Sequence, residues 1–168
     1  PADRDELDAI LRRAYDAFHD PTAHITEYIE KQIERPILVD GVAHKLIIKP
    51  DRVDDLGDGR YRIVDFKSGQ SKKSLLKPDA NDLQLGVYAL GLDWVFGDKD
   101  KNPVGGKAEY WLLRTGERGE LSLEDIDRDK VVAKIAEACR GMLKGEFMPA
   151  ENCDGPCSVL LGPAVETA

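Results

Sequence analysis

The strongest constraint on how this chain can fold is a tight-turn segment, 56–59 (Leu-Gly-Asp-Gly), which stands between two stretches rich in apolar residues. An Asp-Gly pair favours the left-handed backbone of a β-hairpin turn. The stretch 42–53 is therefore predicted to be one strand, with a buried run at 46–48 (Leu-Ile-Ile), and 60–67 is predicted to return beside it. An antiparallel hairpin is the expected centre of the fold.

Helical patterns surround this hairpin. Apolar residues recur at helical spacing in three segments that we predict to be helices, namely 3–18, 81–96 and 127–144. The remaining predictions are a polar loop at 68–79, a strand at 108–114, a pairing segment at 121–123, and either extended chain or a short helix at 25–37. This order predicts an α/β (α+β) fold with a central mixed β-sheet flanked by helices.

Local signals mark where two of these helices begin or end. Asp79 or Asn81 is expected to cap the second helix, because a side-chain oxygen there can accept a hydrogen bond from a free backbone N–H. Gly145 is expected to end the third helix. The apolar stripe of that helix, from Val131 to Leu143, is expected to be buried.

The length of the chain fits one domain. Its 168 residues can enclose a hydrophobic core, and no linker is long enough to divide them. We therefore expect a single domain over 1–168 with a loose tail at 162–168. The first residue is Pro1 rather than Met, which suggests a fragment of a longer protein.

The charge balance disfavours some partners. A formal net charge of −8, taken alone, argues against a partner held by broad electrostatic attraction, such as bare nucleic acid or an anionic membrane. The segment 60–77 reverses this balance, with six positive residues against one negative. No apolar run reaches the length of a membrane span, and three cysteines fit a reducing compartment better than a disulfide framework. We expect a cytoplasmic protein with no membrane partner.

Three charged residues are predicted to converge at the end of the hairpin. Asp65 and Lys67 lie two residues apart on one strand and so share a face, and the hairpin brings Asp51 alongside them. Such a set suits Mg²⁺, which takes one or two carboxylates and fills its other positions with water and phosphate. The alternative is a surface ion pair between Asp65 and Lys67, which contributes about 0–1 kcal/mol.

The same residues carry a family resemblance. Pro50-Asp51, thirteen intervening residues and then Asp65-Phe66-Lys67 resemble the signature of the PD-(D/E)XK nuclease superfamily. The family fold that this resemblance implies is a restriction-endonuclease-like core.

A wider set of motifs is similar to the RecB-type branch of that superfamily. The run 47–69 follows the branch's strand–turn–strand pattern, and Gln84 and Tyr88 match its later Q-x-x-x-Y motif. The segment 145–149, which is followed by cysteines, resembles the ending of the branch. The resemblance covers about residues 25–157.

The resemblance implies a role for each matching residue. The ligands for Mg²⁺ or Mn²⁺ would be Asp51, Asp65, the carbonyl of Phe66 and the upstream Glu30. Lys67 would be the catalytic lysine. Gln84 and Tyr88 lie four residues apart and so share a helix face, which would line the site and contact the substrate strand.

Three upstream glutamates are candidates for a further ligand position. Glu27 and Glu34 are alternatives to Glu30, which best fits the family's step from an apolar residue to Glu. Asp54 is expected to pair with Arg52 rather than to bind metal.

Several RecB-type nucleases hold a [4Fe–4S] cluster, which requires four cysteine ligands. Cys153 and Cys157 lie in the corresponding region, whereas Cys139 falls on the apolar stripe of a predicted helix and is expected to be a core residue. Because the ligand set is incomplete, no iron–sulfur cluster is expected.

Together these features predict a Mg²⁺- or Mn²⁺-dependent (exo)deoxyribonuclease that acts on single-stranded DNA or a duplex end. The resemblance places it in DNA repair or recombination, or beside the helicase domain of a parent protein. Lys72, Lys73 and Lys77 would contact substrate phosphates. The alternative is a catalytically inactive module with a nuclease fold that serves as a scaffold or positions DNA.

Overall fold

The computed structural model describes residues 2–19, 25–97 and 103–145. It divides into two compact units, Pro1–Val132 and Ala133–Ala168. The first unit holds both sheets and the helices α1 to α3, and the second holds most of α4 (Arg128–Lys144). The tail predicted at 162–168 lies outside the described residues.

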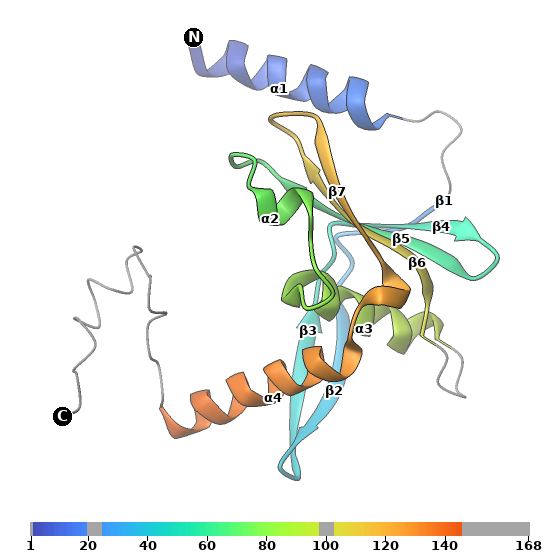
Figure 1. Ribbon diagram of the computed structural model, residues 1–168, viewed down its shortest axis with the longest axis vertical. Helices are drawn as coiled ribbons and strands as arrows, with labels where there is room; N and C mark the ends of the chain where they lie inside the picture. Colours follow the sequence, from blue (N-terminus) through green and yellow to red (C-terminus); the bar gives the residue numbers. More distant parts are fainter. Residues whose placement is uncertain (1, 20–24, 98–102, 146–168) are drawn as a thin grey trace. The chain divides into compact units, whose positions relative to one another are not determined.

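A five-stranded sheet forms the centre of the first unit (Figure 1). Its strands, in spatial order, are β1 (Ile25–Ile29), β4 (Arg52–Gly57), β5 (Arg60–Lys67), β6 (Gly105–Leu112) and β7 (Glu117–Ser122). The neighbours β5 and β6 run parallel, and every other pair is antiparallel. The predicted mixed sheet is therefore confirmed.

The predicted hairpin is present, but its first strand is shorter than expected. β4 pairs antiparallel with β5, and the turn between them includes Asp58 with a positive φ of 55°. The continuous strand predicted at 42–53 is wrong, because β3 (Val42–Ile48) ends before Pro50. Proline has no N–H to donate to a strand ladder, and it separates β3 from β4.

β3 instead pairs with β2 (Ile33–Val39) in a separate two-stranded sheet. The ambiguous segment 25–37 is thus extended, as β1 and the start of β2. The buried run expected at 46–48 is wrong: Ile48 is 1% exposed, whereas Ile47 is 57% exposed. Buried and exposed residues alternate along the β2–β3 hairpin because one face of this hairpin packs on a helix and the other meets solvent.

That helix is α3 (Leu83–Phe96), which also packs on β5 and β6. Its cap is Asp82, whose carboxylate accepts a hydrogen bond from the Leu85 N–H, so neither Asp79 nor Asn81 is the cap. Gly91 allows the close approach of the β2–β3 hairpin, because a Cβ there would lie 3.1 Å from Cδ1 of Ile48.

The other helices depart from prediction in smaller ways. α1 spans Ala2–Phe18, and the loop predicted at 68–79 contains the short helix α2 (Lys73–Leu76). α4 is followed by Gly145 at a positive φ of 72°, as expected of a helix stop. Of its predicted stripe, Val131 is buried.

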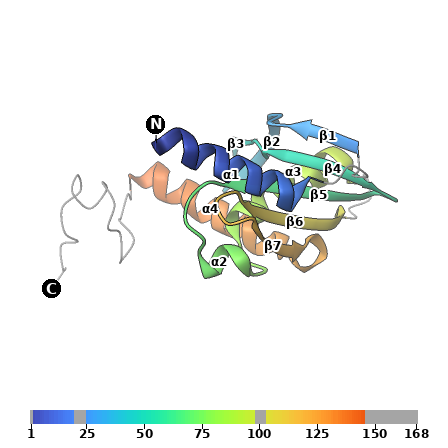
Figure 2. The same ribbon diagram turned by 90° about the horizontal axis from the view of Figure 1, so that it is seen from above.

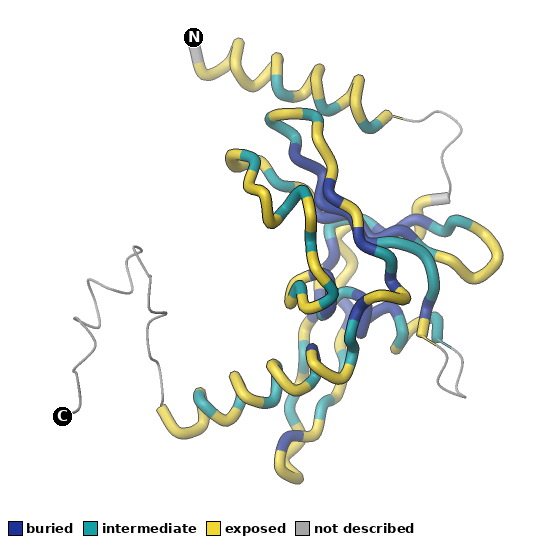
Figure 3. Tube along the Cα trace, viewed as in Figure 1, coloured by how far each residue is buried: buried dark blue, intermediate teal, exposed yellow. Residues whose placement is uncertain are grey.

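The core lies between the five-stranded sheet and α3. Figure 3 shows buried residues concentrated along the strands, while α1 is largely exposed. Phe18 of α1 stacks on Trp111 of β6, whereas Gln84 of α3 meets Asp65 of β5. Trp111 is in register with Phe66, which points to the face opposite Asp65. The two helices therefore lie on opposite faces of the sheet (Figure 2).

A buried charge network stabilises the sheet on the α1 face. The Asp54 carboxylate is fully buried and accepts hydrogen bonds from Arg52 (2.7 Å), from Arg62 (2.6 and 2.9 Å) and from Thr26 (2.9 Å). Burial opposes ionisation, but these hydrogen bonds outweigh it and hold the pKa of Asp54 below its ordinary value. The expected pairing of Asp54 with Arg52 is confirmed.

Asp54→Asn is expected to destabilise the domain by about 3–5 kcal/mol, because it leaves buried guanidinium groups without their counter-charge. Denaturant unfolding at neutral pH measures this. A depressed folded-state pKa adds stability above the unfolded pKa and loses it as pH falls through the folded value. The difference from wild type should therefore shrink below about pH 4. Asp8→Asn, which removes an exposed ion pair with Arg12, is the control and should cost about 0–1 kcal/mol.

Candidate active site

Asp51 and the end of β5 are joined by a direct hydrogen bond. Asp51 lies between Pro50 and the start of β4, and its Oδ2 accepts a hydrogen bond from the Phe66 N–H at 2.7 Å. The break after β3 therefore turns this carboxylate toward the next strand of the hairpin. The side chains of Asp65 and Lys67 follow on the α3 face of β5.

Asp65 is the buried centre of the site, with 3% of its surface exposed. Its Oδ1 accepts hydrogen bonds from Gln84 Nε2 at 2.5 Å and from the Tyr88 hydroxyl at 3.0 Å. Burial raises the pKa of Asp65, the Lys67 ammonium opposes that rise, and the charge of Asp51 adds to it. Asp51 is thus a neighbouring negative charge of Asp65.

Gln84 links the groups of the site to one another. Its Oε1 accepts a hydrogen bond from Lys67 Nζ at 2.8 Å, and its Nε2 donates both to Asp65 and to the Tyr88 hydroxyl. Burial raises the pKa of Tyr88 to about 12, so this hydroxyl stays protonated at neutral pH and donates to Asp65. The helix pair predicted from sequence thus meets the strand residues predicted from sequence.

Two residues that support the site were not predicted. The hydroxyl of Tyr110 on β6 donates to Asp82 Oδ1 at 2.9 Å, and its ring lies 5.1 Å from Lys67 Nζ. Asp82 caps α3, so the two residues connect the lysine to the start of the helix that carries Gln84. The sequence signal for Asp82 was its place before an apolar helix, but nothing in the sequence pointed to Tyr110.

The donor set fits a divalent cation. Asp65 Oδ2 lies 2.6 Å from Lys67 Nζ, but it is buried and makes no hydrogen bond of acceptable geometry within the described part of the chain. A buried carboxylate oxygen with unused acceptor capacity is a suitable ligand for a hard cation. Asp51 supplies the second carboxylate, and its hydrogen bond to Phe66 places that peptide unit beside both.

The upstream glutamate, Glu30, is joined to Asp51 by a hydrogen bond between their backbones. The Glu30 N–H donates to the Asp51 carbonyl at 2.9 Å, while its carboxylate pairs with Lys49 at 2.9 Å. Over residues 2–19, 25–97 and 103–145, no three His, Cys, Asp or Glu side chains gather as a metal-binding group. Asp51 and Asp65 are therefore the two carboxylates of the described residues that could hold a cation here, a number that Mg²⁺ accepts. Of the alternatives, Glu34 pairs with Lys45.

The three lysines predicted to contact phosphate lie around α2 and are exposed. They are Lys72, Lys73 and Lys77. The backbone of α2 packs closely on β7, since a Cβ at Gly119 would clash with the Leu75 carbonyl oxygen. Cys153 and Cys157 lie outside the described residues, and Cys139 is a half-buried free thiol.

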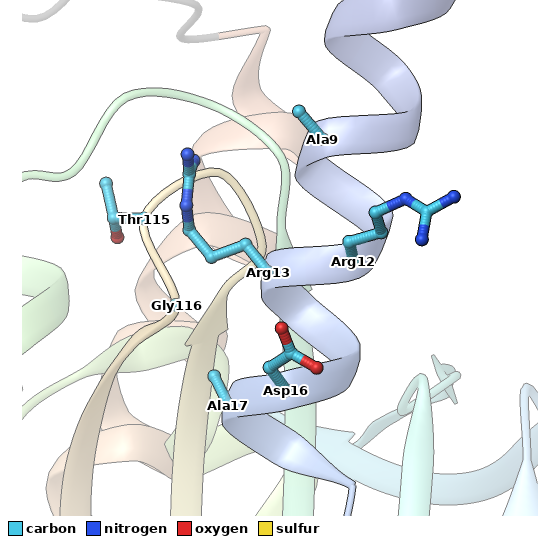
Figure 4. Close-up of a pocket in the computed structure, with 7 residues that line it drawn as sticks. All are labelled: Ala9, Arg12, Arg13, Asp16, Ala17, Thr115 and Gly116. Carbon is cyan, nitrogen blue, oxygen red and sulfur yellow. The ribbon is translucent and has the colours of Figure 1, made fainter.

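A groove that none of these carboxylates lines lies between α1 and the turn that joins β6 to β7 (Figure 4). Its volume is about 560 Å³. Arg13 extends toward Thr115 in the turn, Arg12 points away from it, and Asp16 lies between them (Figure 4). Arg13 donates to the Arg114 carbonyl oxygen. The groove marks where α1 docks on the turn.

A mixed sheet that joins Asp51, Asp65 and Lys67 at one strand end is the arrangement of a nuclease core. Residues 1–160 match the family model described as the PD-(D/E)XK nuclease superfamily. The chain belongs to that superfamily.

The fold is similar to one solved structure described as "Crystal structure of SSO0001". The TM-score is 0.51 at 17% sequence identity, and the match covers 73% of this chain and 52% of that chain. The chain thus spans about half the length of its structural relative. Curated protein sequences gave no significant match. In the described part of the chain, no helix has the length and apolar character needed to cross a membrane.

Proposed function

We propose that this chain is a Mg²⁺- or Mn²⁺-dependent deoxyribonuclease that hydrolyses phosphodiester bonds. The observation that supports this most is the buried Asp65 Oδ2, which pairs with Lys67 at 2.6 Å and meets no further hydrogen-bond donor in the described part of the chain, with Asp51 bonded to the next residue, Phe66. A purely structural ion pair has no need of a second carboxylate bonded to the backbone of the residue between Asp65 and Lys67.

The residues of the chain divide the work of such a reaction. Asp51 and Asp65 hold the ion, which when bound lowers the pKa of a water molecule and polarises a phosphoryl oxygen. Lys67 places an ammonium where negative charge develops on the phosphate in the transition state. Gln84 fixes the positions of Lys67 and Asp65 through hydrogen bonds to both.

The finer assignment rests on the motifs of the RecB-type branch. Gln84 and Tyr88 contact Asp65 directly, which agrees with a role for that motif in the site. On this basis we propose exonucleolytic action on single-stranded DNA or a duplex end, in DNA repair or recombination, with a helicase domain of a parent protein as partner. The exposed lysines around α2 would contact phosphates.

The test is cleavage by the purified wild-type chain of end-labelled single-stranded DNA, blunt duplex, circular DNA and RNA, with Mn²⁺, Mg²⁺ or EDTA. We expect degradation of linear DNA with either metal and none with EDTA. Calorimetry should report Mn²⁺ binding in the absence of DNA. A chain that neither binds Mn²⁺ nor cleaves any of these substrates would instead be a module that positions DNA.

A further inference from the structure

An aromatic pocket of about 200 Å³ lies between α1 and the sheet, on the face opposite Asp65. Phe18 and Trp111 stack with their ring centroids 4.5 Å apart, and Phe66 lies tilted against Trp111 at 5.8 Å. Tyr15 and Arg52 also line the pocket. Aromatic rings and an arginine are the groups on which unpaired nucleobases stack.

The pocket shares chain neighbours with the site. Phe66 directly follows Asp65, and Arg52 directly follows Asp51. Successive residues of an extended strand point to opposite faces, so β5 places Asp65 on the α3 side and Phe66 in the pocket. Arg52, the first residue of β4, lines the pocket directly after Asp51 in the chain. The hydrogen bond from the Phe66 N–H to Asp51 Oδ2 at 2.7 Å links the backbone of this pocket residue to the site directly.

The charge and size of the pocket indicate which kind of ligand fits it. Its lining contains no carboxylate, although the whole chain carries a net charge of −8. Its volume is below the range of about 300–1,000 Å³ that is usual for drug-sized ligands, and so suits a single ring system. Two lining rings are accessible, with Tyr15 61% and Phe66 39% exposed.

We propose that this pocket binds one unpaired base of the substrate strand, next to the phosphate held at Asp51 and Asp65. The inference rests on the proposed function and extends it, because it makes single-stranded DNA the preferred form. A paired base has no free face to offer, so duplex DNA must lose a base pair to use the pocket.

The experiment uses Trp111 as a reporter of the pocket. The chain has two tryptophans, and Trp94→Phe leaves Trp111 as the only one. In EDTA, which prevents cleavage, a single-stranded oligothymidylate should quench Trp111 fluorescence. Phe66→Leu and Tyr15→Leu should each weaken binding about tenfold. The matched control is Tyr61→Leu, on the same strand as Phe66 but outside the pocket lining.

A second experiment removes a base from the DNA instead of an aromatic ring from the protein. Oligonucleotides with one abasic residue, moved stepwise along the strand, should bind wild type about tenfold more weakly at one position and cause no further loss in Phe66→Leu. Equal affinity of all the variants for the intact strand, with no quenching, overturns the inference even where Mn²⁺-dependent cleavage is intact. Absence of cleavage overturns the proposed function, while base-dependent quenching in EDTA still supports the pocket.

Discussion

An Asp65→Asn variant is expected to lose Mn²⁺-dependent cleavage on the order of a thousandfold, because a metal ion contributes several kcal/mol to stabilising the transition state. Asparagine has nearly the same size and can still accept hydrogen bonds from Gln84 and Tyr88, so the site should keep its shape. It lacks the second anionic oxygen, Oδ2, which in wild type lies 2.6 Å from Lys67 Nζ. Calorimetry should show Mn²⁺ binding reduced in parallel with activity.

Folding should survive this change. Burial raises the pKa of Asp65, so the ionised carboxylate costs the folded state free energy at neutral pH. The cost is absent below the unfolded pKa and grows as pH rises through the folded value. Asp65→Asn should therefore match or exceed wild type in thermal stability at pH 7. Any gain in the stability of the variant over wild type should be smaller at pH 4.

The control for this prediction is Asp58→Asn, which removes the same charge from an exposed hairpin turn. Asparagine tolerates the positive φ of that position, so both stability and cleavage should stay near wild type. Equal nicking by Asp65→Asn and wild type would contradict the assignment of Asp65 as a ligand.

The placement of the candidate site residues could be predicted from sequence because it depends on short-range geometry. A two-residue step along a strand fixes the shared face of Asp65 and Lys67, and a four-residue step along a helix fixes that of Gln84 and Tyr88. The turn at 56–59 fixes how β4 meets β5. Each of these relations spans a few residues, so periodicity was sufficient to place the side chains on shared faces, while the family resemblance singled out Gln84 and Tyr88.

Relations across the fold were not available in the same way. Apolar residues continue on both sides of Pro50, and only the pairing of β3 with β2 shows that the chain changes sheets there. Tyr110 reaches Asp82 from a strand 28 positions later, a contact that no local pattern encodes. The apolar periodicity predicted helix α4 correctly. Such a periodicity shows that a helix has an apolar face, but it does not show which part of the molecule covers that face.

The position of Glu30 illustrates the same limit within the site. Its backbone is held beside Asp51 by the pairing of β1 with β4, which a pattern of spacing could suggest. The direction of its side chain depends on Lys49, which attracts the carboxylate at 2.9 Å. The sequence pattern therefore placed the backbone of Glu30 next to Asp51, but it did not determine which atoms the carboxylate of Glu30 contacts.

Lys67→Met is expected to lower cleavage by about 10²–10³-fold while Mn²⁺ binding persists. Methionine keeps the length of the side chain against the Tyr110 ring but removes the ammonium that faces Asp65 and Gln84. The variant separates charge stabilisation by the lysine from metal binding by the carboxylates, which Asp65→Asn cannot do.

The same variant should change how metal binding depends on pH. The Lys67 ammonium lowers the pKa of Asp65, and without it the carboxyl holds its proton to higher pH. Because a metal must displace that proton, Mn²⁺ affinity measured by calorimetry should fall further below wild type at pH 6 than at pH 8. Lys45→Met, which removes an exposed partner of Glu34, should leave both affinity and cleavage unchanged. Loss of Mn²⁺ binding at every pH would show that Lys67 organises the site, and wild-type cleavage would remove the lysine from the mechanism.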